Sequence, residues 1–170
     1  MPASGPVPDT GAAAASTVAV ASTAQTSRSE SSAIPAPTTS ALVVTGDVFG
    51  FDVIEARLGE ESVTLALADE PALRSRGLMG VTDLGSLDGM LFSWGGDVVN
   101  SRFTMRNTLL PLHIVFFDAD GAFVSSRDMV PCEVEECPTY GSAGPYAYAI
   151  EFPAGTVVST DDRLELDLPD

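Results

Sequence analysis

The only histidine of the chain lies where an acid–base group could be positioned by a tight turn. His113 falls in an alternating apolar run, and Asp120-Gly121 after it is a strong hairpin-turn signal. A two-residue turn there would place Asp128 opposite His113 and Val124 opposite Phe117. We therefore predict a His113–Asp128 pair, in which the carboxylate fixes one imidazole tautomer and favours the charged ring. The pair could be structural, or it could serve catalysis or ligand binding.

A second candidate is a basic corner in an otherwise acidic chain. Arg74 and Arg76 end a predicted short helix, and Arg106 lies in the segment 105–108. If these segments meet, they form a spot that suits a carboxylate or phosphate of a small anionic ligand or of a protein partner. The ligand-binding candidates are Arg74, Arg76, Arg106, Asn107, Thr108 and Tyr140. The alternative is that the arginines neutralise internal acids and cap helix carbonyls.

The two cysteines bracket a loop of four residues, three of which are glutamates. We predict a disulfide between Cys132 and Cys137, contributing about 2 kcal/mol because the loop is short. Free structural thiols, a Cys–His nucleophile and a zinc site remain alternatives. Two thiols and one distant histidine are few ligands for zinc, and flanking glutamates disfavour a thiolate.

The segment 118–121 resembles the start of a calcium loop, but Met129 stands where the closing glutamate would fall. We read the segment as a hairpin turn. The sequence also lacks a glycine-rich phosphate loop, a nucleophile elbow and a zinc motif. We therefore expect no metal and no cofactor.

Net charge excludes some partners. The chain carries 24 acids against 8 basic residues, for a formal net charge of −16, and has no lysine. Such a surface repels nucleic acid and anionic lipid, so we expect no nucleic-acid partner. The charge could serve solubility, including solubility in salt, or it could attract cations or basic partners.

Composition divides the chain into a tail and one domain. Residues 1–45 are rich in Ala, Ser, Thr and Pro, which predicts a disordered tail or linker. The tail could also be the remnant of an export signal, although no basic residue precedes Arg28. Residues 46–170 suit a single β domain. We find no transmembrane segment and expect an extracytoplasmic protein, secreted or associated with the cell envelope.

Many short strands and frequent turns predict a mostly β fold, an antiparallel sandwich, jelly-roll-like or barrel-like domain with one short helix. The helix begins after an N-cap at Asp69 and ends before Gly77. Residues 131–144 form a long loop. The predicted strands are Phe51–Leu58, Ser62–Ala68, Gly89–Trp94, Val98–Met105, Leu112–Phe117, Ala122–Val130, Tyr146–Phe152 and Leu164–Leu168.

Several ordered blocks resemble one bacterial and archaeal family, domain of unknown function 192. They are RSRGLM at 74–79, GMLF at 89–92, FTMRNTLLPL at 103–112, FDADG at 117–121, CPTY at 137–140, EFPAG at 151–155 and Asp162-Arg163. The resemblance implies a jelly-roll-like β-sandwich with a short helix, often exported, and no agreed activity. This chain departs from the family pattern at Thr104, usually Trp, at Arg106, usually Lys, and at His113, usually Asp.

Three functions are compatible with these residues. The leading hypothesis is a non-enzymatic extracytoplasmic binding or interaction domain that uses the Arg/Asn corner. A second is a small hydrolase-type enzyme that uses His113 with Asp128 or a cysteine. A third is a structural envelope module, which predicts no ligand pocket.

Overall fold

Strands dominate the chain over residues 48–167, which the computed structural model describes. The predicted tail, residues 1–45, lies outside the described residues. One helix is present in the described part, α1 (Pro71–Arg76). The strands are β1 (Asp52–Leu58), β2 (Glu61–Ala68), β3 (Gly89–Ser93), β4 (Arg102–Thr104), β5 (Leu112–Phe117), β6 (Phe123–Met129), β7 (Thr139–Gly141), β8 (Tyr148–Pro153) and β9 (Leu164–Leu166).

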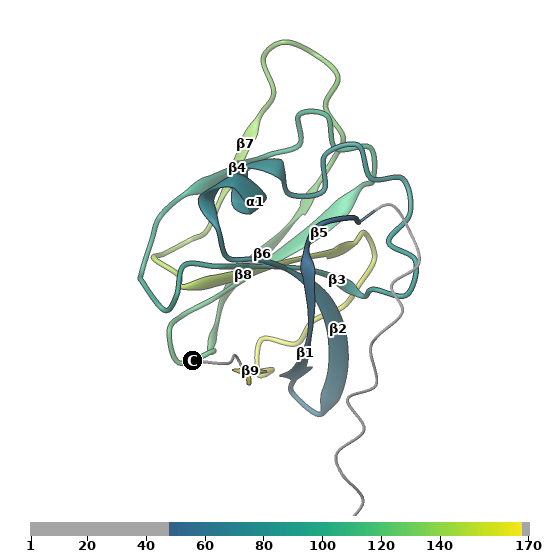
Figure 1. Cartoon of the computed structure of the whole chain (residues 1–170). Helices are drawn as coiled ribbons and strands as arrows, with labels where there is room; N and C mark the ends of the chain where they lie inside the picture. Colours follow the sequence, from purple (N-terminus) through teal and green to yellow (C-terminus); the bar gives the residue numbers. More distant parts are fainter. Residues whose placement is uncertain (1–47, 168–170) are drawn as a thin grey trace, which may run out of the picture. The chain divides into compact units, whose positions relative to one another are not determined.

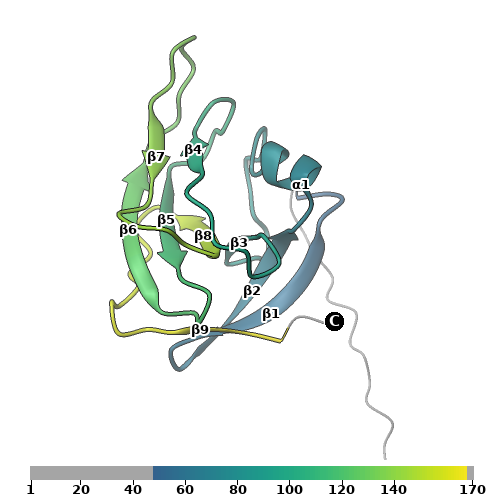
Figure 2. The ribbon, with the colours of Figure 1, turned by 90° about the vertical axis from the view of Figure 1, so that its left-hand side faces the viewer.

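The strands form one large curled sheet and one small ribbon (Figures 1 and 2). The seven-stranded sheet has the order β6-β5-β8-β3-β2-β1-β9, and the ribbon is β4-β7. Every pair of neighbouring strands is antiparallel except β2 and β3, which are parallel. A parallel pair needs a crossover, and the segment between these strands, which contains α1, supplies it. The prediction of a mostly β fold with one short helix is confirmed.

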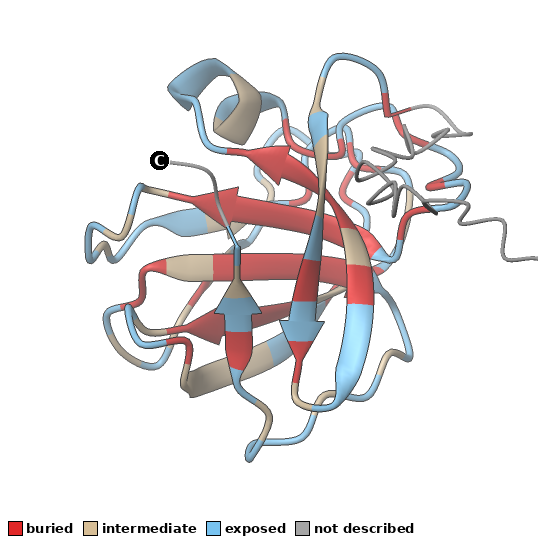
Figure 3. Cartoon of the chain, turned by 60° about the horizontal axis from the view of Figure 1, so that its bottom comes forward, coloured by how far each residue is buried: buried red, intermediate tan, exposed pale blue. Residues whose placement is uncertain are grey.

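The central strands are buried on both faces, which explains why they read as apolar runs (Figure 3). One face packs against α1, β4 and β7 through Leu73, Phe103 and Tyr140. The other face packs against β9 through Leu164 and Leu166. Alternate residues of each central strand therefore belong to two different clusters.

The β5–β6 hairpin keeps the predicted pairing by a different route. Its loop has three residues, since the Asp118 N–H donates to the Ala122 carbonyl and Gly121 adopts a positive φ of 78°. Phe117 consequently pairs with Phe123, so the predicted partner Val124 is wrong. A bulge between Phe116 and Phe117 restores the register, and His113 faces Asp128 as predicted.

Two predicted elements differ from the structure beyond their ends. The strand expected over Val98–Met105 is reduced to β4, and the loop expected over 131–144 contains β7. The two errors have one cause, because β4 pairs with β7 and with no strand of the large sheet. The helix also begins one residue late, with Glu70 and not Asp69 at the N-cap. No helix within residues 48–167 is long and apolar enough to cross a membrane.

Candidate functional site

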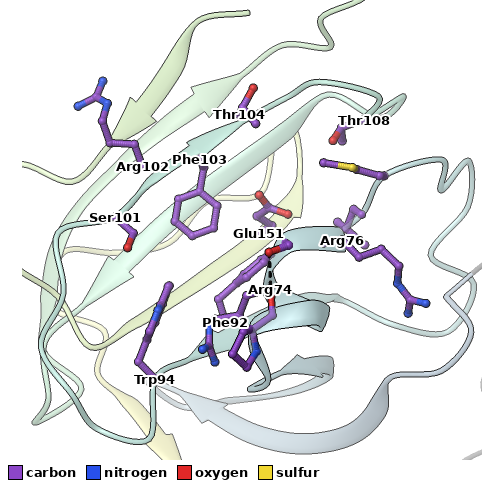
Figure 4. A pocket seen from close by; sticks show the side chains of 15 residues that line it. Arg74, Arg76, Phe92, Trp94, Ser101, Arg102, Phe103, Thr104, Thr108 and Glu151 are labelled. Atoms are coloured by element: carbon purple, nitrogen blue, oxygen red, sulfur yellow. Dashed lines mark hydrogen bonds between the residues drawn. The ribbon is translucent and has the colours of Figure 1, made fainter.

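A cavity of about 370 Å³ lies between α1 and β4, above the large sheet (Figure 4). Its walls come from three places in the sequence: the helix and the residues after it, the end of β3, and the segment leading through β4. The residues that define its chemistry are Arg74, Arg76, Trp94, Arg102, Thr108 and Glu151. This volume suits a small organic molecule.

Glu151 occupies the floor of the cavity. It belongs to β8, where it is the cross-strand partner of Met90 on β3 and of Ile114 on β5, so its side chain shares their apolar face. Gly89 permits this close packing, because a Cβ there would lie 2.3 Å from the Glu151 carbonyl oxygen. The residue is only 5% exposed, and its carboxyl group forms no hydrogen bond or ion pair with residues 48–167. Burial raises the pKa of Glu151 to about 8.

Aromatic rings form one wall beside Glu151. The Phe103 ring packs edge-on against Phe92 at 5.0 Å and against Trp94 at 6.5 Å between centroids. Tyr146 lies behind them, 5.4 Å from Trp94, and its hydroxyl donates to the Ser101 carbonyl at 3.0 Å. Burial raises the pKa of Tyr146 to about 12, so its hydroxyl remains a neutral donor that fixes the start of β4.

The helix places two arginines at the cavity. Arg74 donates from Nη1 to the carbonyls of Asp69 and Ser93, and its guanidinium lies 5.3 Å from the centroid of Trp94. Arg76 donates to the Phe49 carbonyl at 2.5 Å and stacks on a phenylalanine ring at 4.0 Å. Gly77 ends the helix with a positive φ of 46° and directs the chain back along the cavity. The arginines thus bind carbonyls outside the helix, and neither the helix carbonyls nor the internal acids of the alternative prediction are their partners within residues 48–167.

The opposite side of the cavity is formed by β4 and the turn after it. Arg102 donates from Nε and Nη2 to the side chain and carbonyl of Thr139 on β7, at 2.8 and 2.7 Å. Thr104 lines the cavity where the family resemblance leads one to expect tryptophan, a much larger side chain. Thr108 is 6% exposed and also lines the cavity.

The predicted basic corner is partly assembled. Arg74, Arg76 and Thr108 line the cavity, whereas Arg106, Asn107 and Tyr140 are outside its lining. The Arg106 guanidinium contacts the Glu135 carbonyl in the loop between the cysteines. Asn107 has a positive φ of 58° and its carbonyl accepts from the Gly80 N–H. The Tyr140 hydroxyl accepts from the Val130 N–H at 3.4 Å.

The histidine pair forms as predicted, but away from the cavity. His113 Nδ1 lies 2.6 Å from Asp128 Oδ1, with the two side chains 15% and 79% exposed. His113 is the partner of Phe152, on the sheet face opposite to Glu151. It therefore cannot act on a molecule bound in the cavity.

The cysteines lie together and apart from the cavity. The sulfur atoms of Cys132 and Cys137 are 2.10 Å apart, at disulfide distance, with their Cα atoms 5.8 Å apart. Neither residue lines the cavity. Within residues 48–167, no group of three or more His, Cys, Asp or Glu side chains could hold a metal ion.

Sequence reasoning missed Glu151, Arg102 and the aromatic wall. The available signal for Glu151 was an acid in the middle of an apolar strand, Tyr148–Pro153. Arg102 carried no comparable signal, since it reaches the cavity only because β4 pairs with β7 outside the large sheet.

The fold and the cavity define a class: a small β protein whose curled sheet carries a buried acid beneath a ligand-sized cavity. The chain belongs to the family domain of unknown function 192, described as an uncharacterized ACR, whose model matches residues 53–166. No curated protein matches the chain.

Two crystal structures resemble it. One, from Sinorhizobium meliloti 1021, is provisionally described as a transcription regulator; it has 34% sequence identity and a TM-score of 0.60, over 71% of this chain and 97% of that one. The other, from Novosphingobium aromaticivorans DSM 12444, is a protein of unknown function with 25% identity and a TM-score of 0.62, over 74% and 94%.

Proposed function

We propose that this protein binds a small organic anion in the cavity between α1 and β4. One observation carries the proposal: three arginines border a cavity of about 370 Å³ in a chain whose net charge is −16. The chain has only eight basic residues, so three at one cavity raise the local potential against a negative background. Guanidinium groups pair well with carboxylate and phosphate oxygens.

The guanidinium groups of Arg76 and Arg102 point away from Glu151 at the border of the cavity (Figure 4), and each keeps N–H donors beyond those used on its own partner. A guanidinium has five N–H donors, and Arg76 uses one of its nitrogens on Phe49 while Arg102 uses two on Thr139. Their partners are carbonyl and hydroxyl oxygens and not carboxylates. Within residues 48–167, the two ion pairs are Arg57–Glu165 and His113–Asp128, so no acid there neutralises the arginines of the cavity.

The same geometry favours binding over the other two hypotheses. A purely structural module predicts no pocket, whereas a ligand-sized cavity is present. A hydrolase that uses His113 or a cysteine needs those groups at the substrate, and none of them lines the cavity.

Nucleic acid remains an unsuitable partner on this proposal. The Sinorhizobium meliloti protein is provisionally described as a transcription regulator. This chain carries a net charge of −16, which repels a phosphate backbone, so we do not extend that description to it.

We further propose an extracytoplasmic location, secreted or associated with the cell envelope. The support is the pair of cysteines at disulfide distance, since disulfides persist in oxidising compartments. Fractionation of the native organism followed by detection of the full chain tests this proposal. Recovery in the cytoplasm alone would contradict it.

The binding proposal is tested with three compounds of one shape and different charge: benzoate, benzamide and benzamidine. Calorimetric titration of the full chain at pH 6 and low salt should show binding in the order benzoate, benzamide, benzamidine. Equal affinities, or a preference for benzamidine, would contradict an anion site.

Two exposed arginines provide the variants. Arg76→Gln and Arg102→Gln should each weaken benzoate binding about fivefold, the effect of losing roughly 1 kcal/mol of charge interaction at a partly exposed site. The matched control is Arg57→Gln, which changes the net charge equally but removes a guanidinium on β1 that pairs with Glu165. If all three variants weaken binding alike, net charge and not the cavity is responsible.

A further inference from the structure

Glu151 is the one acid among the residues that line the cavity, and anion binding by the arginines alone would give this acid no role. Its side chain is almost fully buried, points into the cavity from β8, and has no hydrogen bond or ion pair with residues 48–167 (Figure 4). No side-chain oxygen or nitrogen of the described residues is both fully buried and without a partner, so the Glu151 oxygens are open to the cavity, and a partner that enters from outside can bind them.

We infer that Glu151 binds the ligand as a neutral carboxylic acid, donating its O–H hydrogen bond to an oxygen of the bound anion. This inference rests on the proposed function and deepens it, since it assigns the residue that recognises the anion and the form in which it does so. A neutral carboxyl group is a donor, whereas a carboxylate accepts only and would repel an anion.

The surroundings of Glu151 favour the neutral form. The neighbouring strands present Met90 and Phe92 from β3 and Ile114 from β5, none of which titrates or carries charge. The charged groups that share the cavity are Arg74 and Arg76 from the helix and Arg102 from β4. These arginines donate hydrogen bonds to carbonyl and hydroxyl oxygens of neighbouring residues, and not to Glu151.

Desolvation decides whether Glu151 is protonated or ionised. Burial raises the pKa of Glu151 to about 8, and desolvation is its single identified cause, with no lowering by an arginine. At neutral pH the group therefore keeps its proton without a ligand. An anion that accepts this proton's hydrogen bond stabilises the neutral form further, while the arginines at the mouth balance the charge of the ligand.

The walls indicate the class of anion. Phe92, Trp94 and Phe103 offer an apolar wall of rings packed edge to face beside the acid, with hydroxyls of Ser101 and Thr108 nearby. A small aromatic or otherwise planar carboxylate fits this arrangement, with its ring on the aromatic wall and an oxygen at Glu151.

The test is the pH dependence of benzoate binding, since benzoate stays ionised from pH 6 to pH 9. If only the neutral form of Glu151 binds, benzoate affinity falls about tenfold between pH 6 and pH 9, because the binding-competent fraction falls by that factor. Glu151→Gln keeps an N–H donor but cannot titrate, so its affinity should be independent of pH. Glu165→Gln, an equal charge change at an exposed position of β9, should retain the wild-type profile.

A second measurement needs no variant. Carboxyl ¹³C NMR of the wild-type full chain should show Glu151 ionising at higher pH with benzoate bound than without it. Wild-type binding that is the same at pH 6 and pH 9, with Arg76→Gln still weaker, overturns this inference and leaves the proposed function intact. No benzoate binding at pH 6 overturns both. Benzamidine binding that strengthens with pH and is lost in Glu151→Gln shows a carboxylate that binds cations, and also overturns both.

Discussion

Glu151 should make the protein less stable as the pH rises, in the absence of any ligand. In the unfolded chain this carboxyl group loses its proton near the ordinary value of 4.5, whereas burial raises the pKa of Glu151 to about 8 in the folded protein. Between these values the folded state binds one more proton than the unfolded state, so the free energy of unfolding decreases with pH. From pH 5 to pH 8 the loss is about 3.5 kcal/mol, since the full slope of 1.36 kcal/mol per unit holds only between the two pKa values. This is an upper bound because water entering the cavity solvates the carboxylate.

The assay is urea unfolding of the wild type and of Glu151→Gln at pH 5, 6, 7, 8 and 9, without ligand. The other acids titrate in both proteins and cancel in the difference. Stability of the variant relative to the wild type should therefore rise by about 3.5 kcal/mol between pH 5 and pH 8 and then level off. Glu165→Gln, which removes an exposed acid, should show no such rise. A difference that stays constant with pH would refute the reasoning, since it would mean that Glu151 ionises as freely as in water.

Three other features lead to separate expectations. Replacing Cys132 and Cys137 by Ser should lower the free energy of unfolding by about 2 kcal/mol, and alkylation of both thiols without reductant, seen by intact mass, would show that no disulfide forms. Gly121→Ala should lower the free energy of unfolding in urea by about 3 kcal/mol, because its Cβ would lie 2.0 Å from a β9 carbonyl oxygen. Gly155→Ala has open space around it and should cost about 1 kcal/mol for its positive φ alone. Equal costs for the two variants would exclude the clash. Asp128→Asn should cost less than about 1 kcal/mol, because this carboxylate is 79% exposed, and should leave benzoate titrations unchanged; weaker benzoate binding would contradict its separation from the cavity.

Most of the large sheet could be predicted from local pattern. Its seven strands were placed within one or two residues at each end, because apolar runs bounded by turn residues identify buried strands without knowledge of their partners. The His113–Asp128 pair was also predicted, but through two compensating errors. The loop is one residue longer than expected, and a bulge removes the shift before the chain reaches His113. Such bulges have no reliable sequence signal, so the turn rule by itself would not have predicted this pair from the observed three-residue loop.

The basic corner shows where pattern reasoning stops. Proximity in the sequence grouped Arg106, Asn107 and Thr108, but successive residues in a turn point in different directions, and of these only Thr108 reaches the cavity. Arg102 reaches it because β4 pairs with β7 and not with the large sheet. A strand of three residues that pairs far along the chain has too little local pattern to be assigned from sequence.

The same departure of β4 explains why Glu151 could not be recognised as a site residue. Within Tyr148–Pro153 an acid among apolar residues could end in a salt bridge or in solvent at an edge, and both cost little. Glu151 is a candidate site residue because a cavity lies above it on this face of the sheet. Were the segment over β8 filled by apolar side chains, an acid there would be buried in the core without a partner, which proteins avoid. Because α1 and β4 stand apart over that face, the acid lines a cavity and keeps an unused hydrogen bond. Burying Glu151 costs free energy, and an oxygen of an incoming ligand could offset that cost by accepting a hydrogen bond from the acid in the cavity. This combination of a buried acid and a cavity is the reason to look for a ligand there first within residues 48–167.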